Sequence, residues 1–304
     1  MNLVNSPAPR KAAAPHEPLI GRGFFFNGAW AIGVVMRLYL AAGLVLLLSV
    51  TASAAETAWV DLAPGVRARL IASEVRHADG TTLVGLEVEM PENTKTYWRV
   101  PGESGIPTEI AIDGSVGVSS ATILWPYPKT ETANGYHDYV YYGHTVLPVE
   151  LKVDGDSPVL NAAVTLGVCS DICVPAMARF SLPLSFAKAD QAQGLRLTQA
   201  LAETPMAWAE RHDAIESVRF DRDANALEIV VGDPDVDWSS LIADMGFDGE
   251  LFGTPQKSPD GRTILLPLLG QGDSAGLVGQ SVNLTFLTPM GAFETSKRVQ
   301  AAAD

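Results

Sequence analysis

The two cysteines of this 304-residue chain lie three residues apart, in the segment GVCSDICVPA (residues 167–176). Thiols at this spacing can form a disulfide, bind a soft metal ion or exchange electrons with another disulfide. A helix through the segment is disfavoured, because Val174 precedes Pro175 and a residue before proline avoids helical dihedral angles. Strand-like apolar runs flank the pair, so we expect Cys169 and Cys173 to face each other at the end of a β-hairpin.

Three roles for the pair remain open on the residues alone: redox exchange, metal binding and a structural disulfide in a binding module. A disulfide closing about five residues contributes only about 2 kcal/mol in the chain-entropy model, which favours redox exchange over a structural role. The copper alternative uses both thiolates, which are soft ligands for Cu(I), with His144 or Met177 as a further ligand. Asp171 lies between the cysteines, and its carboxylate opposes thiolate formation, so we expect modestly reactive thiols.

The start of the chain predicts export. Arg37 precedes an apolar run over residues 38–50 and small residues ending at Ala54, which is the order found in secretory signal peptides. We expect translation to start at Met36 and cleavage to follow Ala54. The alternative is an uncleaved membrane anchor over about residues 24–50, in which the charge of Arg37 would cost about 2.5–3.5 kcal/mol.

The part of the chain after this signal is strongly acidic. The whole sequence has 21 Lys and Arg against 35 Asp and Glu, and residues 1–54 hold four of the basic and one of the acidic residues. Residues 55–304 therefore carry 17 basic and 34 acidic side chains, a formal charge of −17. This charge excludes nucleic acid and anionic lipid surfaces as expected partners and suits an exported, extracytoplasmic protein. No phosphate loop or dinucleotide fingerprint is present, so we expect no cofactor.

Period-two alternation of apolar and polar residues predicts β-strands in the first half, for example over residues 66–70, 86–90 and 149–153. Turn segments rich in Asp, Asn and Gly separate these runs. We therefore predict a mainly β protein whose first domain, residues 60–187, is an immunoglobulin-like β-sandwich.

The pattern changes after this domain. Helix-forming residues predict a helical connector over residues 188–211, in which Leu197 and Leu201 lie one turn apart. A second small domain, residues 212–300, is predicted as either α+β or a second β-sandwich. Within it, the segment DWSSLIADM is expected to form a short helix capped by Asp237.

Two weaker motifs carry no predicted chemistry. Residues 101–105 (PGESG) resemble a nucleophile elbow but lack the Gly-x-Ser-x-Gly spacing, so we expect an ordinary loop. The aspartates of residues 233–244 resemble a calcium loop, but Trp238 stands where glycine is required, so we expect a turn.

Three longer segments place the cysteine pair in a family context. In order, the chain contains TYWRVPGESGIPTEI, YYGHTVLPVELKV and TLGVCSDICVPA. Together they resemble the N-terminal periplasmic domain of the DsbD family of thiol:disulfide interchange proteins, and most closely its copper-tolerance branch, ScsB. The resemblance covers about residues 60–186. It implies an immunoglobulin-like fold and a redox-active disulfide between Cys169 and Cys173, in a component of a thiol–disulfide oxidoreductase or protein-disulfide reductase.

The resemblance also implies partners. In the family, the pair receives electrons from a membrane-embedded domain and passes them to periplasmic thioredoxin-like proteins. Here no apolar run of about 20 residues follows residue 55 and no C-x-x-C motif is present, so we expect a separate membrane protein to donate the electrons. This chain also has three residues between its cysteines, where the enterobacterial type has five.

A shield over the pair is the last implied feature. The family covers its cysteines with a loop that carries an aromatic residue, and the matching segment here is YPKTETANGYHDY. Tyr136 is therefore the expected shield, and Tyr97 and Trp98 are expected near the pair. The alternative for all three aromatic side chains is ordinary packing.

Overall fold

The computed structural model of the chain describes residues 55–133, 135–209, 212–259, 261, 263–270 and 276–302. The signal peptide or anchor expected over residues 1–54 lies outside these ranges. Among the described residues, no helix combines the length and the apolar character that crossing a membrane requires.

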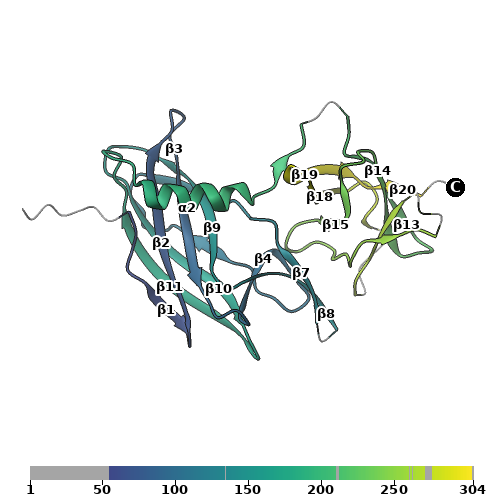
Figure 1. Cartoon of the computed structure of the whole chain (residues 1–304), viewed down its shortest axis with the longest axis horizontal. Helices are drawn as coiled ribbons and strands as arrows, with labels where there is room; N and C mark the ends of the chain where they lie inside the picture. The colour runs from purple at the N-terminus through teal and green to yellow at the C-terminus, as the bar shows by residue number, and fades with distance from the viewer. Residues whose placement is uncertain are drawn as a thin grey trace, which may run out of the picture. The chain divides into compact units, whose positions relative to one another are not determined.

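The first domain consists of two antiparallel β-sheets that enclose one core (Figure 1). Sheet 1 has the order β1 (Val60–Ala63), β2 (Val66–Arg76), β3 (Thr81–Glu89), β9 (Thr145–Val153) and β6 (Val118–Ile123). Sheet 2 has the order β11 (Cys173–Pro183), β10 (Val159–Cys169), β4 (Lys95–Gly102), β8 (Tyr136–Tyr142) and β7 (Lys129–Ala133), and β5 (Glu109–Ala111) also pairs with β10. The predicted mainly β fold is confirmed, and the sheets are consistent with an immunoglobulin-like sandwich.

The alternation seen in the sequence explains these strands. In β2, Ala68 and Leu70 point into the core, and in β11 every second residue from Ala176 to Leu182 is buried while those between are exposed. Each fully buried leucine-sized side chain contributes about 1.5–3 kcal/mol relative to exposure. One face of each strand is therefore fixed toward the core, and this sets the register of the hairpin that carries both cysteines.

The described residues include one α-helix, α2 (Gln191–Ala202), which lies over β2, β3 and β9 of sheet 1 (Figure 1). It starts at Asp190, whose side chain accepts a hydrogen bond from the Gln193 amide at 2.9 Å. Its buried residue Leu197 packs against Gly85 of β3. The helix approaches the sheet so closely here that a Cβ on Gly85 would lie 2.6 Å from Leu197 Cδ2. The helix falls within the segment predicted to be a helical connector.

The remaining strands form two further sheets around a second core. One has the order β12 (Met206–Ala207), β19 (Gly291–Arg298), β18 (Ser281–Thr288) and β15 (Asp237–Asp244). The other has the order β16 (Gln256–Lys257), β17 (Ile264–Pro267), β14 (Ala226–Val231), β13 (Ile215–Asp221) and β20 (Gln300–Ala301). Large aromatic side chains, among them Phe220, Phe252 and Phe286, fill the core between them.

The predicted short helix in DWSSLIADM is wrong. The segment forms β15, which pairs antiparallel with β18. All five residues from Ser240 to Asp244 are buried, so both faces of the strand are covered. A continuously buried run has no polar side, and its periodicity cannot distinguish a strand from a short helix. Asp237 does accept a hydrogen bond from the Ser239 amide, as a cap would, but this bond begins a strand.

Candidate redox site

The β10–β11 hairpin brings the two cysteines together. Cys169 is the last residue of β10, Cys173 is the first of β11, and the two are direct partners in the strand register. Their Cα atoms are 4.1 Å apart and their sulfur atoms form a disulfide. The predicted hairpin with the pair at its end is therefore confirmed.

The two cysteines differ sharply in exposure. Cys169 is 1% exposed and packs with Tyr97 and Val140, and its strand position pairs with Lys95 of β4 on the other side of β10. Cys173 is exposed and belongs to β11, which forms the edge of sheet 2. The adjoining side chains of Ile172 and Val174 are also exposed, at 75% and 41%. A partner protein can therefore reach Cys173, and it would meet apolar side chains around that cysteine.

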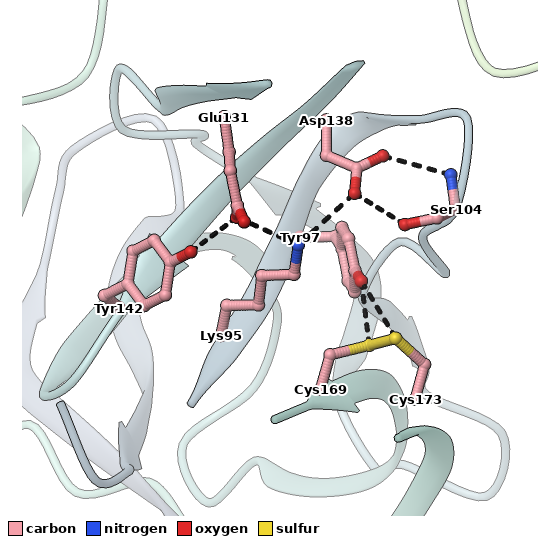
Figure 2. Close-up of a disulfide and its surroundings, with 8 residues drawn as sticks. All are labelled: Lys95, Tyr97, Ser104, Glu131, Asp138, Tyr142, Cys169 and Cys173. Atoms are coloured by element: carbon pink, nitrogen blue, oxygen red, sulfur yellow. Dashed lines mark hydrogen bonds and ion pairs between the residues drawn. A yellow bond between two sulfur atoms is a disulfide. The ribbon is translucent and has the colours of Figure 1, made fainter. Parts of the chain in front are cut away.

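Tyr97 of β4 is the residue that contacts both sulfur atoms (Figure 2). Its hydroxyl donates a hydrogen bond to Cys169 Sγ at 2.8 Å and lies 3.3 Å from Cys173 Sγ. The side chain is fully buried, and this burial raises the pKa of the phenol above its usual value of 10.0. Tyr97 therefore remains protonated at neutral pH, and its hydroxyl can donate a hydrogen bond to sulfur.

A charged cluster lies beside this tyrosine. Lys95 Nζ is 2.9 Å from Glu131 Oε2 and 3.3 Å from Asp138 Oδ2, and it lies 5.6 Å from the centre of the Tyr97 ring. Burial alone would lower the pKa of Lys95, but the hydrogen bond to Glu131 and the nearby negative charges outweigh it and raise that pKa. Burial would raise the pKa of Glu131, but hydrogen bonds from Tyr142 and Lys95 lower it. Lys95 and Glu131 therefore stay ionised at neutral pH.

Asp138 connects the cluster to the loop after β4. Its carboxylate accepts hydrogen bonds from the Ser104 amide at 3.0 Å and from the Ser104 hydroxyl at 2.5 Å (Figure 2). Gly105, the next residue, lies against the Tyr97 ring, since a Cβ there would be 2.2 Å from Tyr97 Cδ1. The PGESG segment, predicted to be an ordinary loop, therefore ends against Tyr97, the residue that contacts the disulfide.

The structure does not bring the other two aromatic candidates to the pair. Trp98 follows Tyr97 on β4 and therefore points to the opposite face, where it packs in the core at 5.5 Å from the Tyr139 ring. Tyr136 starts β8, whereas the strand position that pairs with Lys95 is Tyr142. Six residues along a strand span roughly 20 Å, so exposed Tyr136 lies far from the sulfur atoms.

The expected further ligands for copper also lie elsewhere. Met177 is four residues from Cys173 along β11, or roughly 13 Å. His144 Nε2 is 2.7 Å from Glu87 Oε1, in an ion-pair cluster under α2. In the described part of the chain, no three or more His, Cys, Asp or Glu side chains gather as a metal site.

Sequence reasoning missed four residues of this site, which are Lys95, Ser104, Glu131 and Asp138. One signal was available, because Lys95 and Tyr97 occupy alternate positions of one strand and so share a face. Ser104, Glu131 and Asp138 are brought to the site by the pairing of β4 with β8 and of β8 with β7, which no local sequence pattern predicts.

Comparisons with known proteins agree with this site. Residues 67–185 match the family model described as the N-terminal part of the thiol:disulfide interchange protein DsbD. The structure is similar to the crystal structure of the N-terminal periplasmic domain of ScsB from Proteus mirabilis, with 26% sequence identity and a TM-score of 0.64. That match covers 82% of this chain and 100% of the other, so it extends beyond the 119 residues from 67 to 185. No curated relative matches the chain.

The family model covers the hairpin with both cysteines. In sequence and in fold, the first domain of this chain therefore resembles the N-terminal domain of the DsbD and ScsB thiol:disulfide interchange proteins, as its sequence motifs predicted.

Proposed function

We propose that the chain is an exported thiol–disulfide exchange module that carries electrons between a separate membrane donor and thioredoxin-like proteins of the periplasm. One observation carries the proposal: a disulfide with one exposed and one buried cysteine, whose sulfur atoms contact the hydroxyl of buried Tyr97. The likeness to the DsbD and ScsB domains supports interchange chemistry and a thioredoxin-like kind of partner.

The exposure of the cysteines supports one order of exchange. A thiolate of the reduced partner attacks Cys173 Sγ, the S–S bond breaks, and Cys169 Sγ leaves with the electron pair. The partner is then joined to Cys173 by a mixed disulfide. A second thiolate of the partner attacks its own sulfur in that bond and releases Cys173 as a thiolate. Two electrons have moved to this chain, the partner is oxidised, and both cysteines can take up protons from water.

Tyr97 gives the buried leaving group its stabilisation. A thiolate at Cys169 would form where water has little access, and burying an unpaired charge is costly. The Tyr97 hydroxyl already points at Cys169 Sγ, so its hydrogen bond can strengthen as negative charge develops on the sulfur. The same donor lowers the thiol pKa of Cys169, because hydrogen bonding to the charged form favours that form.

The reduction potential of the Cys169–Cys173 pair tests this proposal. The protein is equilibrated with glutathione buffers to give the potential, and the reduced protein is then mixed with an oxidised thioredoxin-like protein; the free thiols are counted by alkylation and mass spectrometry. We expect a potential above about −300 mV and the transfer of two electrons to the thioredoxin-like protein. A potential below about −300 mV, with no transfer, would identify a structural disulfide and refute exchange.

A further inference from the structure

We propose that Asp138 is a positioning residue of the exchange site. Through the Ser104 loop, it holds the Tyr97 ring so that the hydroxyl points at the two sulfur atoms. The inference rests on the proposed exchange function and assigns a role to a carboxylate that contacts neither cysteine.

The first observation is the set of donors around Asp138. The residue is 2% exposed, and its carboxylate accepts hydrogen bonds from the Ser104 amide, the Ser104 hydroxyl and the Lys95 ammonium group. These donors come from β4 and from the loop that follows it, while Asp138 itself belongs to β8. A buried carboxylate is costly unless its hydrogen bonds are satisfied, so Asp138 ties the loop to β8.

The second observation is how the loop begins. Gly102 has φ of +95°, and a Cβ there would lie 2.2 Å from the His137 carbonyl oxygen. The next residue, Glu103, donates its amide to that carbonyl at 3.1 Å and accepts a bond from the His137 amide at 2.8 Å. The loop is therefore attached to β8 at both His137 and Asp138, and its path past Tyr97 is fixed.

The third observation is the contact that the loop makes. Gly105 lies against one edge of the Tyr97 ring, and Gly167 of β10 lies near the other, where an added Cβ would be 3.0 Å from Tyr97 Cδ2. The Gly167 amide also donates a hydrogen bond to the Ile106 carbonyl at 3.3 Å. The ring is thus confined between the loop and β10, and movement of the loop would allow the hydroxyl to leave the sulfur atoms.

Two effects of Asp138 on the disulfide have opposite signs. Removing its negative charge favours a nearby thiolate and so promotes reduction. Releasing the loop removes the fixed donor from the thiolate and so opposes reduction. Glu131 provides a matched control, because it also contacts Lys95 Nζ and carries a negative charge but makes no bond to Ser104. The difference between variants at these two positions therefore reports on the loop.

The experiment measures the equilibrium constant for reduction of Asp138→Asn and Glu131→Gln in glutathione buffers at pH 7. We expect reduction of Asp138→Asn to be about tenfold less favourable than that of Glu131→Gln, which corresponds to a potential about 30 mV more negative. The charge-neutral variant Ser104→Ala removes one of the loop bonds and should lower the constant at least threefold relative to wild type.

A double-mutant cycle separates positioning from general damage to the fold. In a Tyr97→Phe background there is no hydroxyl to position, so Asp138→Asn should differ from Glu131→Gln by less than twofold there. Equal constants for the two variants in the wild-type background would overturn the proposal, as would a tenfold difference that persists without the Tyr97 hydroxyl. If Asp138→Asn does not fold, the same cycle with Ser104→Ala decides.

These outcomes are distinct from failure of the proposed function. Glutathione buffers report on the disulfide and its surroundings without any protein partner. A wild-type chain that exchanges no electrons with thioredoxin-like proteins would contradict the exchange proposal, while the variant potentials would still show whether Asp138 positions Tyr97.

Discussion

The Tyr97 hydroxyl should lower the thiol pKa of Cys169, and replacement of Tyr97 by phenylalanine tests this directly. Phenylalanine keeps the ring between Gly105 and Gly167 and removes only the group that lies 2.8 Å from Cys169 Sγ. A hydrogen bond to a charged group contributes about 1.5–3 kcal/mol. Since one pKa unit corresponds to about 1.4 kcal/mol, the Cys169 thiol pKa should rise by about 1–2 units in the variant.

The assay follows Cys169 alone. In a Cys173→Ser background, the ¹³Cβ chemical shift of Cys169 is recorded against pH with and without the Tyr97 hydroxyl. Because the donor stabilises the thiolate, the protein with Tyr97 should titrate at the lower pH. Equal titration curves, or a lower pKa in Tyr97→Phe, would refute the role of Tyr97 as a thiolate donor.

Three further predictions concern stability. Gly85→Ala should destabilise the fold by about 1–3 kcal/mol, because the new Cβ would lie 2.6 Å from Leu197 Cδ2. The control Gly194→Ala, on α2 with open space around it, should raise the melting temperature, because alanine favours a helix over glycine. Equal effects of the two variants on thermal unfolding would contradict this packing. Burial opposes ionisation of Glu87, but hydrogen bonds from His144 and Arg69 outweigh burial and lower the Glu87 pKa below 4.5. Ionised Glu87 therefore contributes stability above pH 4.5, and this stability is lost as the pH falls through the lowered pKa. The stability of Glu87→Gln, measured by unfolding against pH, should lack this acid dependence. Reduction of the disulfide should lower the melting temperature by only about 4–8 °C, because a bond closing about five residues contributes about 2 kcal/mol. Loss of the β signal in circular dichroism on reduction would instead show that the disulfide is structural.

The features that sequence could predict are local ones. The apolar alternation on both sides of the cysteines and the proline after Val174 are sufficient to predict a hairpin with Cys169 and Cys173 at its end. Alternation also predicts the mainly β fold, because one face of each strand must be buried. The motifs that carry the family resemblance lie within these strands and the loops between them.

The features that sequence missed depend on pairing between distant strands. Asp138 reaches Lys95 and Ser104 because β8 pairs with β4, and that register is set by the whole sandwich. The same register places Tyr136 roughly 20 Å along β8 from the disulfide. In β15, burial of all five residues from Ser240 to Asp244 removed the alternation that identifies a strand, so a short helix was predicted there. Long-range register and two-sided burial leave no local pattern in one sequence.

We propose that electrons enter and leave through the exposed sulfur of Cys173, and trapping of a mixed disulfide is a direct test. Cys169→Ser keeps Cys173, and Cys173→Ser keeps only the buried cysteine. Each variant is mixed with a thioredoxin-like protein that has a single active-site cysteine, activated as a mixed disulfide with thionitrobenzoate. The products are identified by mass spectrometry without reductant. We predict a covalent one-to-one complex through Cys173 for Cys169→Ser and at least tenfold less complex for Cys173→Ser. Equal trapping by both variants, or trapping only through Cys169, would contradict exchange through Cys173.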